Sequence, residues 1–208
     1  TGDFLPKGRR PYRSMYTTVL HVEALPGVDE LPLKISVRFR KLHPDREDRV
    51  TAFSPAGEKI FERVIPSGSG WHSLRIPMPE TGRYRVRIFD QKTGFSLRVA
   101  EGIPMVIERV IPYGMTPRLY FFVPEGTEKI AMHNQPLPGS PTSLYEPGGE
   151  EIVLEQEGPL VVQQVPPGAD GKVWGLQRNS TSIPVRLLNV PPYFALSPRT
   201  LMVPKDAR

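Results

Sequence analysis

The sequence predicts an all-β protein of two tandem antiparallel β-sandwich, jelly-roll-like domains, and three observations lead to this expectation. Apolar and polar residues alternate in many short runs, as in residues 33–40 and 83–90, which is the pattern of strands with one buried and one solvated face. Proline accounts for 25 of the 208 residues. Because proline has no N–H for a ladder or a helix interior, this content divides the chain into short extended segments.

The third observation is a repeated strand–turn–strand phrase. Residues 54–61, Ser-Pro-Ala-Gly-Glu-Lys-Ile-Phe, return as residues 146–153, Glu-Pro-Gly-Gly-Glu-Glu-Ile-Val, and residues 76–84 return as residues 165–173. The two matches keep their order at a shift of about ninety residues, which predicts an internal duplication. We therefore expect a basic N-terminal arm or linker over residues 1–13, a first sandwich over 14–110, and a second sandwich with a proline-rich C-terminal tail over 111–208.

Short β-rich runs bounded by turn residues mark the expected strands. In the first domain they cover residues 16–23, 33–40, 49–53, 59–64, 71–76, 83–90 and 95–99. Residues 103–113 form a strand or a stiff connector, and the second domain offers 118–123, 129–133, 143–145, 151–154, 160–165, 172–176 and 185–190. Regularly spaced short strands are typical of sandwiches and jelly rolls, and no window longer than two turns has helical periodicity.

Composition excludes several classes of protein. The chain has no cysteine, so it has no disulfide, thiolate metal site or cysteine nucleophile. The formal net charge is +5, which favours weak attraction to acidic polymers, but no nucleic-acid-binding motif accompanies it, so no specific nucleic-acid partner is expected. No apolar run of about 18 residues is present, so no membrane insertion is expected.

The second domain resembles a known family. Residues 120–130 read Tyr-Phe-Phe-Val-Pro-Glu-Gly-Thr-Glu-Lys-Ile, residues 145–150 read Tyr-Glu-Pro-Gly-Gly-Glu, and residues 165–174 read Val-Pro-Pro-Gly-Ala-Asp-Gly-Lys-Val-Trp. This order resembles bacterial pre-peptidase C-terminal-like β-sandwich domains of large secreted multidomain proteins. The resemblance covers residues 115–205, and more loosely 16–100. It implies an extracellular, cell-surface or periplasmic location and supplies no catalytic residues.

Two tryptophans are candidates for stacking on a sugar ring, because an indole offers a large apolar face. Trp71 follows a Gly-Ser-Gly loop and precedes His72, so Trp71 is expected at an exposed strand start. Trp174 lies within an apolar strand. The alternative for both tryptophans is a place in the core.

Arginines spaced by two residues form a second set of candidate ligand-binding residues: Arg38, Arg40, Arg83, Arg85 and Arg87. Each group projects from one side of its strand. If the two strands are neighbours in one sheet, the arginines form a basic face that can clamp sulfate or carboxylate groups. The alternative is a solvated sheet face with acidic partners on adjacent strands.

Metal and catalytic patterns are weak. The four histidines lack zinc-ligand spacing. Asp45, Glu47 and Asp48 are the residues of an acidic loop that could bind Ca²⁺, although a solvated turn explains them as well. Glu155 and Glu157 have the spacing of paired carboxylates but are expected at a hairpin tip. We therefore expect no catalytic residue, no metal and no cofactor.

These observations predict a non-catalytic ancillary module of a secreted or surface bacterial protein that binds carbohydrate, with acidic polysaccharide as one candidate ligand. Trp71, His72 and the arginines would supply stacking and anion contacts. The alternative is a structural or protein-interaction β-sandwich module in an extracellular or envelope assembly, whose working surfaces would be exposed edge strands and the N-terminal arm.

Overall fold

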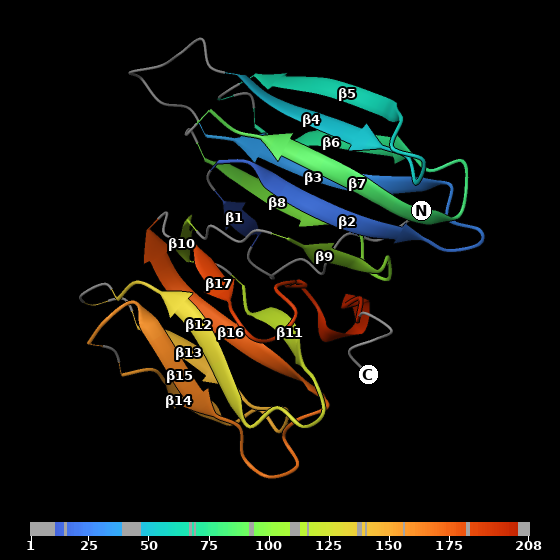
Figure 1. Ribbon diagram of the computed structural model, residues 1–208. Coiled ribbons are helices and arrows are strands. Elements are labelled where there is room, and N and C mark those ends of the chain that lie inside the picture. Colours follow the sequence, from blue (N-terminus) through green and yellow to red (C-terminus); the bar gives the residue numbers. More distant parts are fainter. Residues whose placement is uncertain are drawn as a thin grey trace.

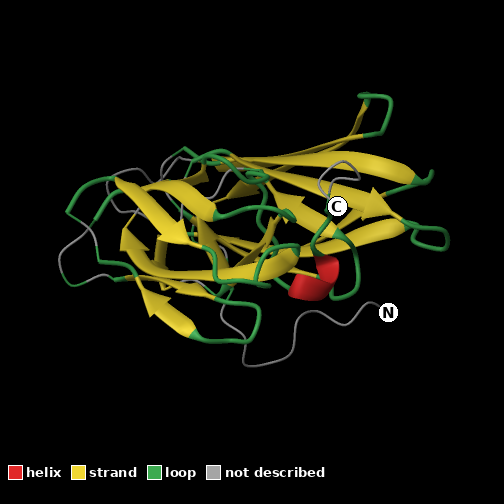
Figure 2. Cartoon of the chain, turned by 60° about the horizontal axis from the view of Figure 1, so that its bottom comes forward, coloured by secondary structure: helices red, strands yellow, loops and turns green. Residues whose placement is uncertain are grey.

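The computed structural model describes residues 11–203, except for positions 15, 39–46, 67, 69, 92–93, 109–112, 116, 137–138, 140, 156 and 182–183. The chain is all-β, with antiparallel pairing throughout the described sheets. The only helical element among the described residues is one 3-10 turn, η1 (Pro198–Thr200), the short red segment in Figure 2. The predicted fold class is therefore confirmed. No helix in this part of the chain has the length and apolar character needed to cross a lipid bilayer.

The first unit is a sandwich of two sheets, each named here by a central strand (Figure 1). The β7 sheet has the order β5 (Lys59–Pro66), β4 (Glu47–Phe53), β7 (Gly82–Phe89), β2 (Thr18–Ala24) and β9 (Met105–Ile107). The β3 sheet has the order β1 (Tyr12–Ser14), β8 (Phe95–Val99), β3 (Glu30–Val37) and β6 (His72–Pro77).

Alternation along the strands builds the core between these sheets. Every second residue of β3 and of β7 is buried: Leu31, Leu33, Ile35, Val37, Tyr84, Val86 and Ile88. Full burial of one such aliphatic side chain contributes about 1.5–3 kcal/mol. Pro32 lies within β3 where this strand pairs with β6 alone, since pairing with β8 begins at Leu33, so its missing N–H breaks no second ladder.

The second unit is also a sandwich. Its β16 sheet contains β14 (Glu151–Val153), β13 (Thr142–Tyr145), β16 (Lys172–Thr181), β11 (Leu119–Val123) and β10 (Tyr113–Met115), with β10 and β11 both paired to β16. Its β12 sheet has the order β15 (Leu160–Gln164), β12 (Lys129–Asn134) and β17 (Val185–Leu187).

Seven strands of each unit, β2–β8 and β11–β17, follow the same topology. The path β5-β4-β7-β2 recurs as β14-β13-β16-β11, and β6-β3-β8 recurs as β15-β12-β17. The repeated phrase forms the same hairpin turn in both units: Gly57 donates to the Ser54 carbonyl over 2.9 Å, and Gly149 donates to the Glu146 carbonyl over 2.9 Å. The repeat thus marks equivalent turns, while a common origin of the two units stays a prediction.

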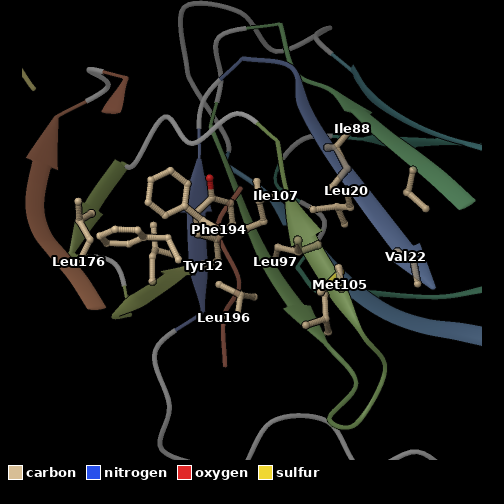
Figure 3. Close-up of a cluster of buried hydrophobic side chains, with 14 of the residues drawn as sticks. Tyr12, Leu20, Val22, Ile88, Leu97, Met105, Ile107, Leu176, Phe194 and Leu196 are labelled. Atoms are coloured by element: carbon tan, nitrogen blue, oxygen red, sulfur yellow. The ribbon is translucent and has the colours of Figure 1, made fainter. Parts of the chain in front are cut away.

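The C-terminal segment connects the two units. Phe194 exchanges backbone hydrogen bonds with Ile107 of β9, and the next residue, Ala195, exchanges them with Tyr120 of β11. The Phe194 ring lies edge-on to Phe121, with centroids 5.9 Å apart. Figure 3 shows Phe194 among buried side chains from both units, and the buried residues form one continuous cluster. The proline-rich tail is therefore part of the packing.

The first sandwich begins earlier than the sequence indicated. Tyr12 is 1% exposed and pairs with Leu97 through β1. The expected arm over residues 1–13 therefore overlaps a strand at its end, and residues 1–10 lie outside the described part of the chain. Strand β1 has only three residues, one of them charged, and so short a run is not enough to predict a strand.

Candidate functional site

The outer surface of the β3 sheet carries the candidate site. Side chains that alternate with the core residues point away from the sandwich, and across the four strands they form rows. In one row Arg13 is opposite Ser96, which is opposite Ser36. In the next, Arg98 is opposite Lys34, which is opposite Ser73. We call this surface the β3 face: Arg13, Lys34, Ser36, Arg38, Trp71, Ser73, Arg75, Ser96 and Arg98.

Trp71 supplies the exposed aromatic group of the β3 face. It directly precedes β6, has the outward parity of Ser73, and is 44% exposed. The guanidinium carbon of Arg98 lies 5.0 Å from the centroid of the Trp71 ring, a cation–π contact of the kind that contributes about 0.5–1 kcal/mol at exposed sites. The indole therefore has a cationic partner against its ring and stays partly open to solvent.

A hollow of about 210 Å³ is the second feature of the β3 face. Its lining residues are Arg13, Ser36, Arg38, Gly94, Phe95 and Ser96. Backbone contacts fix its wall: the Arg38 N–H donates to the Gly94 carbonyl over 2.9 Å, and the Gly94 N–H donates to the buried Asp90 carboxylate at 3.1 and 3.2 Å. Gly94 has a φ of 83°, which a residue with a side chain adopts only with strain.

Positive charge predominates on the β3 face. The four strands contain a single acidic residue, Glu30, which forms an ion pair with Arg75. Arg13, Lys34 and Arg98 add further cationic groups. The Nε of Arg98 is buried, and no described residue accepts a hydrogen bond from it. Arginine forks bind carboxylate and sulfate groups in a bidentate manner, so this surface is suited to an anionic ligand.

The expected joint arginine face is not formed. Arg38 follows β3, whereas Arg83, Arg85 and Arg87 lie on β7 in the opposite sheet. The two sets therefore project from opposite sides of the sandwich, and the condition that their strands are neighbours fails. Arg40 lies outside the described residues. Alternation reveals which side of a strand is polar, but it does not reveal which sheet the strand joins.

The arginines of β7 already have partners on their own surface. Arg83 lies 3.6 Å from the Glu23 carboxylate. The guanidinium carbon of Arg85 is 4.7 Å from the centroid of the Phe53 ring, and that of Arg87 is 5.9 Å from the centroid of Phe89. For Arg83, the alternative interpretation of a solvated face with acidic partners on adjacent strands therefore holds. On this surface, therefore, one arginine is paired with a carboxylate and two lie against aromatic rings.

His72 and Trp71 point to opposite sides of the β3 sheet. It has the inward parity of Leu74 and Ile76 and is half-buried, while Trp71 points outward. The period of two makes consecutive residues point to opposite faces of a sheet, so the structure does not bring His72 to the β3 face beside Trp71.

Trp174 belongs to the core. Its side chain is fully buried, and its Nε1 donates to the Ala169 carbonyl over 2.8 Å. Such burial prevents contact with a sugar, so the core alternative holds for Trp174.

The acidic candidates lie in places other than those expected. Asp48 is fully buried in β4 opposite Ile65, and Asp45 lies outside the described residues. Glu155 and Glu157 connect β14 to β15 in a different sheet, so they are not at a hairpin tip. In the part of the chain described, no cluster of three or more His, Cys, Asp or Glu side chains could hold a metal ion.

Four cationic residues of the β3 face were not among the predicted site residues: Arg13, Lys34, Arg75 and Arg98. Arg98 lies in the alternating run 95–99, so its outward direction was readable from the sequence. The contact between Arg98 and Trp71 could not be predicted from the sequence, because β8 and β6 lie on opposite sides of β3. Arg13 was assigned to the arm rather than to a strand.

Comparison with known proteins identifies no relative: no protein-family description, no curated protein and no solved structure matches the chain. The resemblance to pre-peptidase C-terminal-like domains therefore stays a prediction.

Proposed function

We propose that the chain is a non-catalytic module that binds acidic polysaccharide through the β3 face. The observation that carries the proposal is the placement of an exposed indole, Trp71, beside a hollow lined by Arg13 and Arg38. The surrounding strands contain one acidic residue, which is already paired with Arg75.

The indole and the hollow are close enough to serve one ligand. Ile35 pairs with His72, so Ser36 and Trp71, the adjacent residues on the two strands, lie at the same level of the sheet. Neighbouring strands are about 4.8 Å apart, and Ser36 also lines the hollow. One sugar residue stacked on Trp71 would therefore place a neighbouring anionic substituent near the arginines.

The Trp71 indole and the arginine-lined hollow are suited to different groups of an acidic sugar. The apolar C–H face of a sugar packs on an indole, while arginine forks and serine hydroxyls bind carboxylate or sulfate oxygens. An exported or surface-displayed bacterial protein is the setting that the sequence resemblance predicts for such a module, and we retain it as part of the proposal.

The first experiment is affinity electrophoresis of the full chain in gels that contain neutral, uronic or sulfated polysaccharide. We expect retardation in acidic gels that persists at moderate salt and is lost in W71A. F89A is the matched control, since Phe89 is 41% exposed on the opposite sheet, and it should behave as the wild type. Equal mobility of all three proteins in every gel would reject the proposal.

A pair of arginine variants separates a specific site from general positive charge. R38Q and R85Q remove the same charge from exposed positions on opposite faces. Binding at the β3 face predicts that R38Q weakens retardation several-fold and R85Q leaves it nearly unchanged. Equal losses, together with disappearance of retardation in salt, would indicate only that the protein is basic.

A structural or protein-interaction module is the second candidate function. It is favoured by one observation, an uncharged strand at an open sheet edge, β15. This candidate predicts no retardation by any polysaccharide together with self-association or capture of a protein partner.

A further inference from the structure

In the part of the chain that the structure describes, strand β15 leaves one side of its backbone without a partner strand. It lies at the end of the β12 sheet and pairs with β12 alone. The Asn134 N–H donates to the Pro159 carbonyl over 2.7 Å, and the Val165 N–H donates to the Glu128 carbonyl over 2.8 Å. Antiparallel pairs alternate in hydrogen bonding, so Val161 and Gln163 face β12. The backbone N–H and C=O groups of Leu160, Val162 and Gln164 therefore face the open edge.

This edge lacks the features that protect the other edges. β5 carries Lys59, Glu62 and Arg63, ends in Pro66, and pairs across a register shift at Ala52/Phe53. β6 contains Arg75 and Pro77, and the three-residue strands β14 and β17 each carry a charge. Charge, proline, bulges and short length are the usual means of preventing edge-to-edge pairing. β15, Leu-Val-Val-Gln-Gln, has five residues and none of these features.

Exposed apolar side chains accompany the open backbone. Leu160 is 62% exposed, Val162 55% and Leu188 54%. Val162 is opposite Ala131 in β12, and the Leu188 N–H donates to the Ala131 carbonyl over 2.9 Å. Val162, Ala131 and Leu188 thus form one apolar row across the outer surface of the β12 sheet, and the row ends at the open edge.

The opposite side of β12 is closed. The Asn189 side chain accepts from the Ala131 N–H over 2.8 Å and donates to the Lys129 carbonyl over 2.7 Å, which continues the pairing that β17 begins. At the open edge, one carbonyl has a local partner: the Gln163 amide donates to the Gln164 carbonyl over 3.0 Å. A carbonyl oxygen accepts two hydrogen bonds, so this contact does not prevent strand addition.

We propose that β15 pairs antiparallel with β15 of a second copy of the chain, about a twofold axis at Val162. In this register Val162 is opposite Val162 of the partner subunit, and Leu160 is opposite Gln164 of the partner subunit. The two β12 sheets become one continuous sheet, and the Leu188–Ala131–Val162 row continues into the same row of the second copy. The interface is isologous, so the assembly closes as a dimer.

The composition of β15 favours a second copy of the chain as the partner at the open edge. The strand has no charge, so self-pairing places no like charges opposite each other. Charged edges such as β5 need a partner of complementary charge, whereas this neutral, apolar edge is complementary to itself.

Sedimentation equilibrium of the full chain without polysaccharide tests the proposal independently of the proposed function. We expect a concentration-dependent monomer–dimer equilibrium. V162K places an ammonium group at the twofold axis and should weaken association at least tenfold. V64K is the matched control, since Val64 is 37% exposed on the edge strand β5, and it should leave association unchanged. A chain that stays monomeric at every concentration, or a dimer that V162K leaves intact, would overturn the proposal.

A single introduced cysteine tests the register, because the chain has no cysteine of its own. Opposite residues in a hydrogen-bonded antiparallel pair have Cα atoms about 5.5 Å apart, within the range that a disulfide spans. Mild oxidation should convert V162C, but not V64C, into a covalent dimer that a reductant separates. Absence of this V162C dimer while the wild type dimerises would overturn the proposed register.

Discussion

The guanidinium carbon of Arg98 lies 5.0 Å from the centroid of the Trp71 ring, although Arg98 belongs to β8 and Trp71 precedes β6, on opposite sides of β3. The contact restricts the orientations that the indole can adopt. A positioned aromatic group loses less conformational freedom when a ligand binds. The relationship therefore links the packing of the β3 sheet to the proposed binding of polysaccharide.

The two tryptophans are predicted to report on different surroundings. Trp71 is 44% exposed and Trp174 is fully buried. In W71F the remaining fluorescence, from Trp174, should be blue-shifted, resist acrylamide quenching and show no response to acidic polysaccharide. Wild-type emission should be quenched and should respond. Strong quenching of W71F, with circular dichroism unchanged, would contradict the assigned burial.

Phe194 is predicted to couple the unfolding of the two units. Its ring is 1% exposed and packs against Phe121, while its backbone pairs with β9 of the first unit. Truncation of a buried phenylalanine costs about 3–5 kcal/mol. We expect F194A to lower the stability by this amount and to separate one calorimetric transition into two. A single transition at the wild-type temperature would show that this contact does not couple the units.

Gly82 is predicted to be more sensitive to substitution than Gly27. Both have positive φ, 132° for Gly82 and 83° for Gly27, so alanine is strained at either site. A Cβ on Gly82 would also lie 2.9 Å from Pro55 Cγ, whereas a Cβ on Gly27 meets no atom within 4 Å.

Overpacking of this kind costs about 1–3 kcal/mol. Urea unfolding should therefore show G82A to be less stable than G27A by a difference in this range. Equal stability of the two variants would mean that Pro55 moves aside without cost.

The strands were largely predictable because burial on one face imposes alternation. The run 95–99 coincides with β8. The expected strand 59–64 begins where β5 begins, and β5 continues to Pro66. Strand β3 begins at Glu30 rather than at Leu33, because Pro32 is tolerated where the strand has a single neighbour. Local pattern therefore specified the elements, while their ends depended on which neighbours they acquired.

The candidate site was predictable only in part, because it depends on sheet partnership. Trp71 and Arg38 were recognised and do share the β3 face, but Arg85 lies in the other sheet. Period-two alternation could have excluded His72 as a companion of Trp71. No local signal specified that Arg98 would meet Trp71 across β3, since cross-strand neighbours are set by the folded topology.

Mapping of amide and indole chemical shifts in a labelled sample, titrated with a sulfated oligosaccharide, is the decisive test of polysaccharide binding at the β3 face. Binding at this face predicts saturable shifts of the Trp71 indole N–H and of the Ser36, Arg38 and Ser96 amides, with little change at Arg85, Phe89 or the Trp174 indole. Shifts spread evenly over the basic residues of both sheets, or no shifts at all, would contradict it.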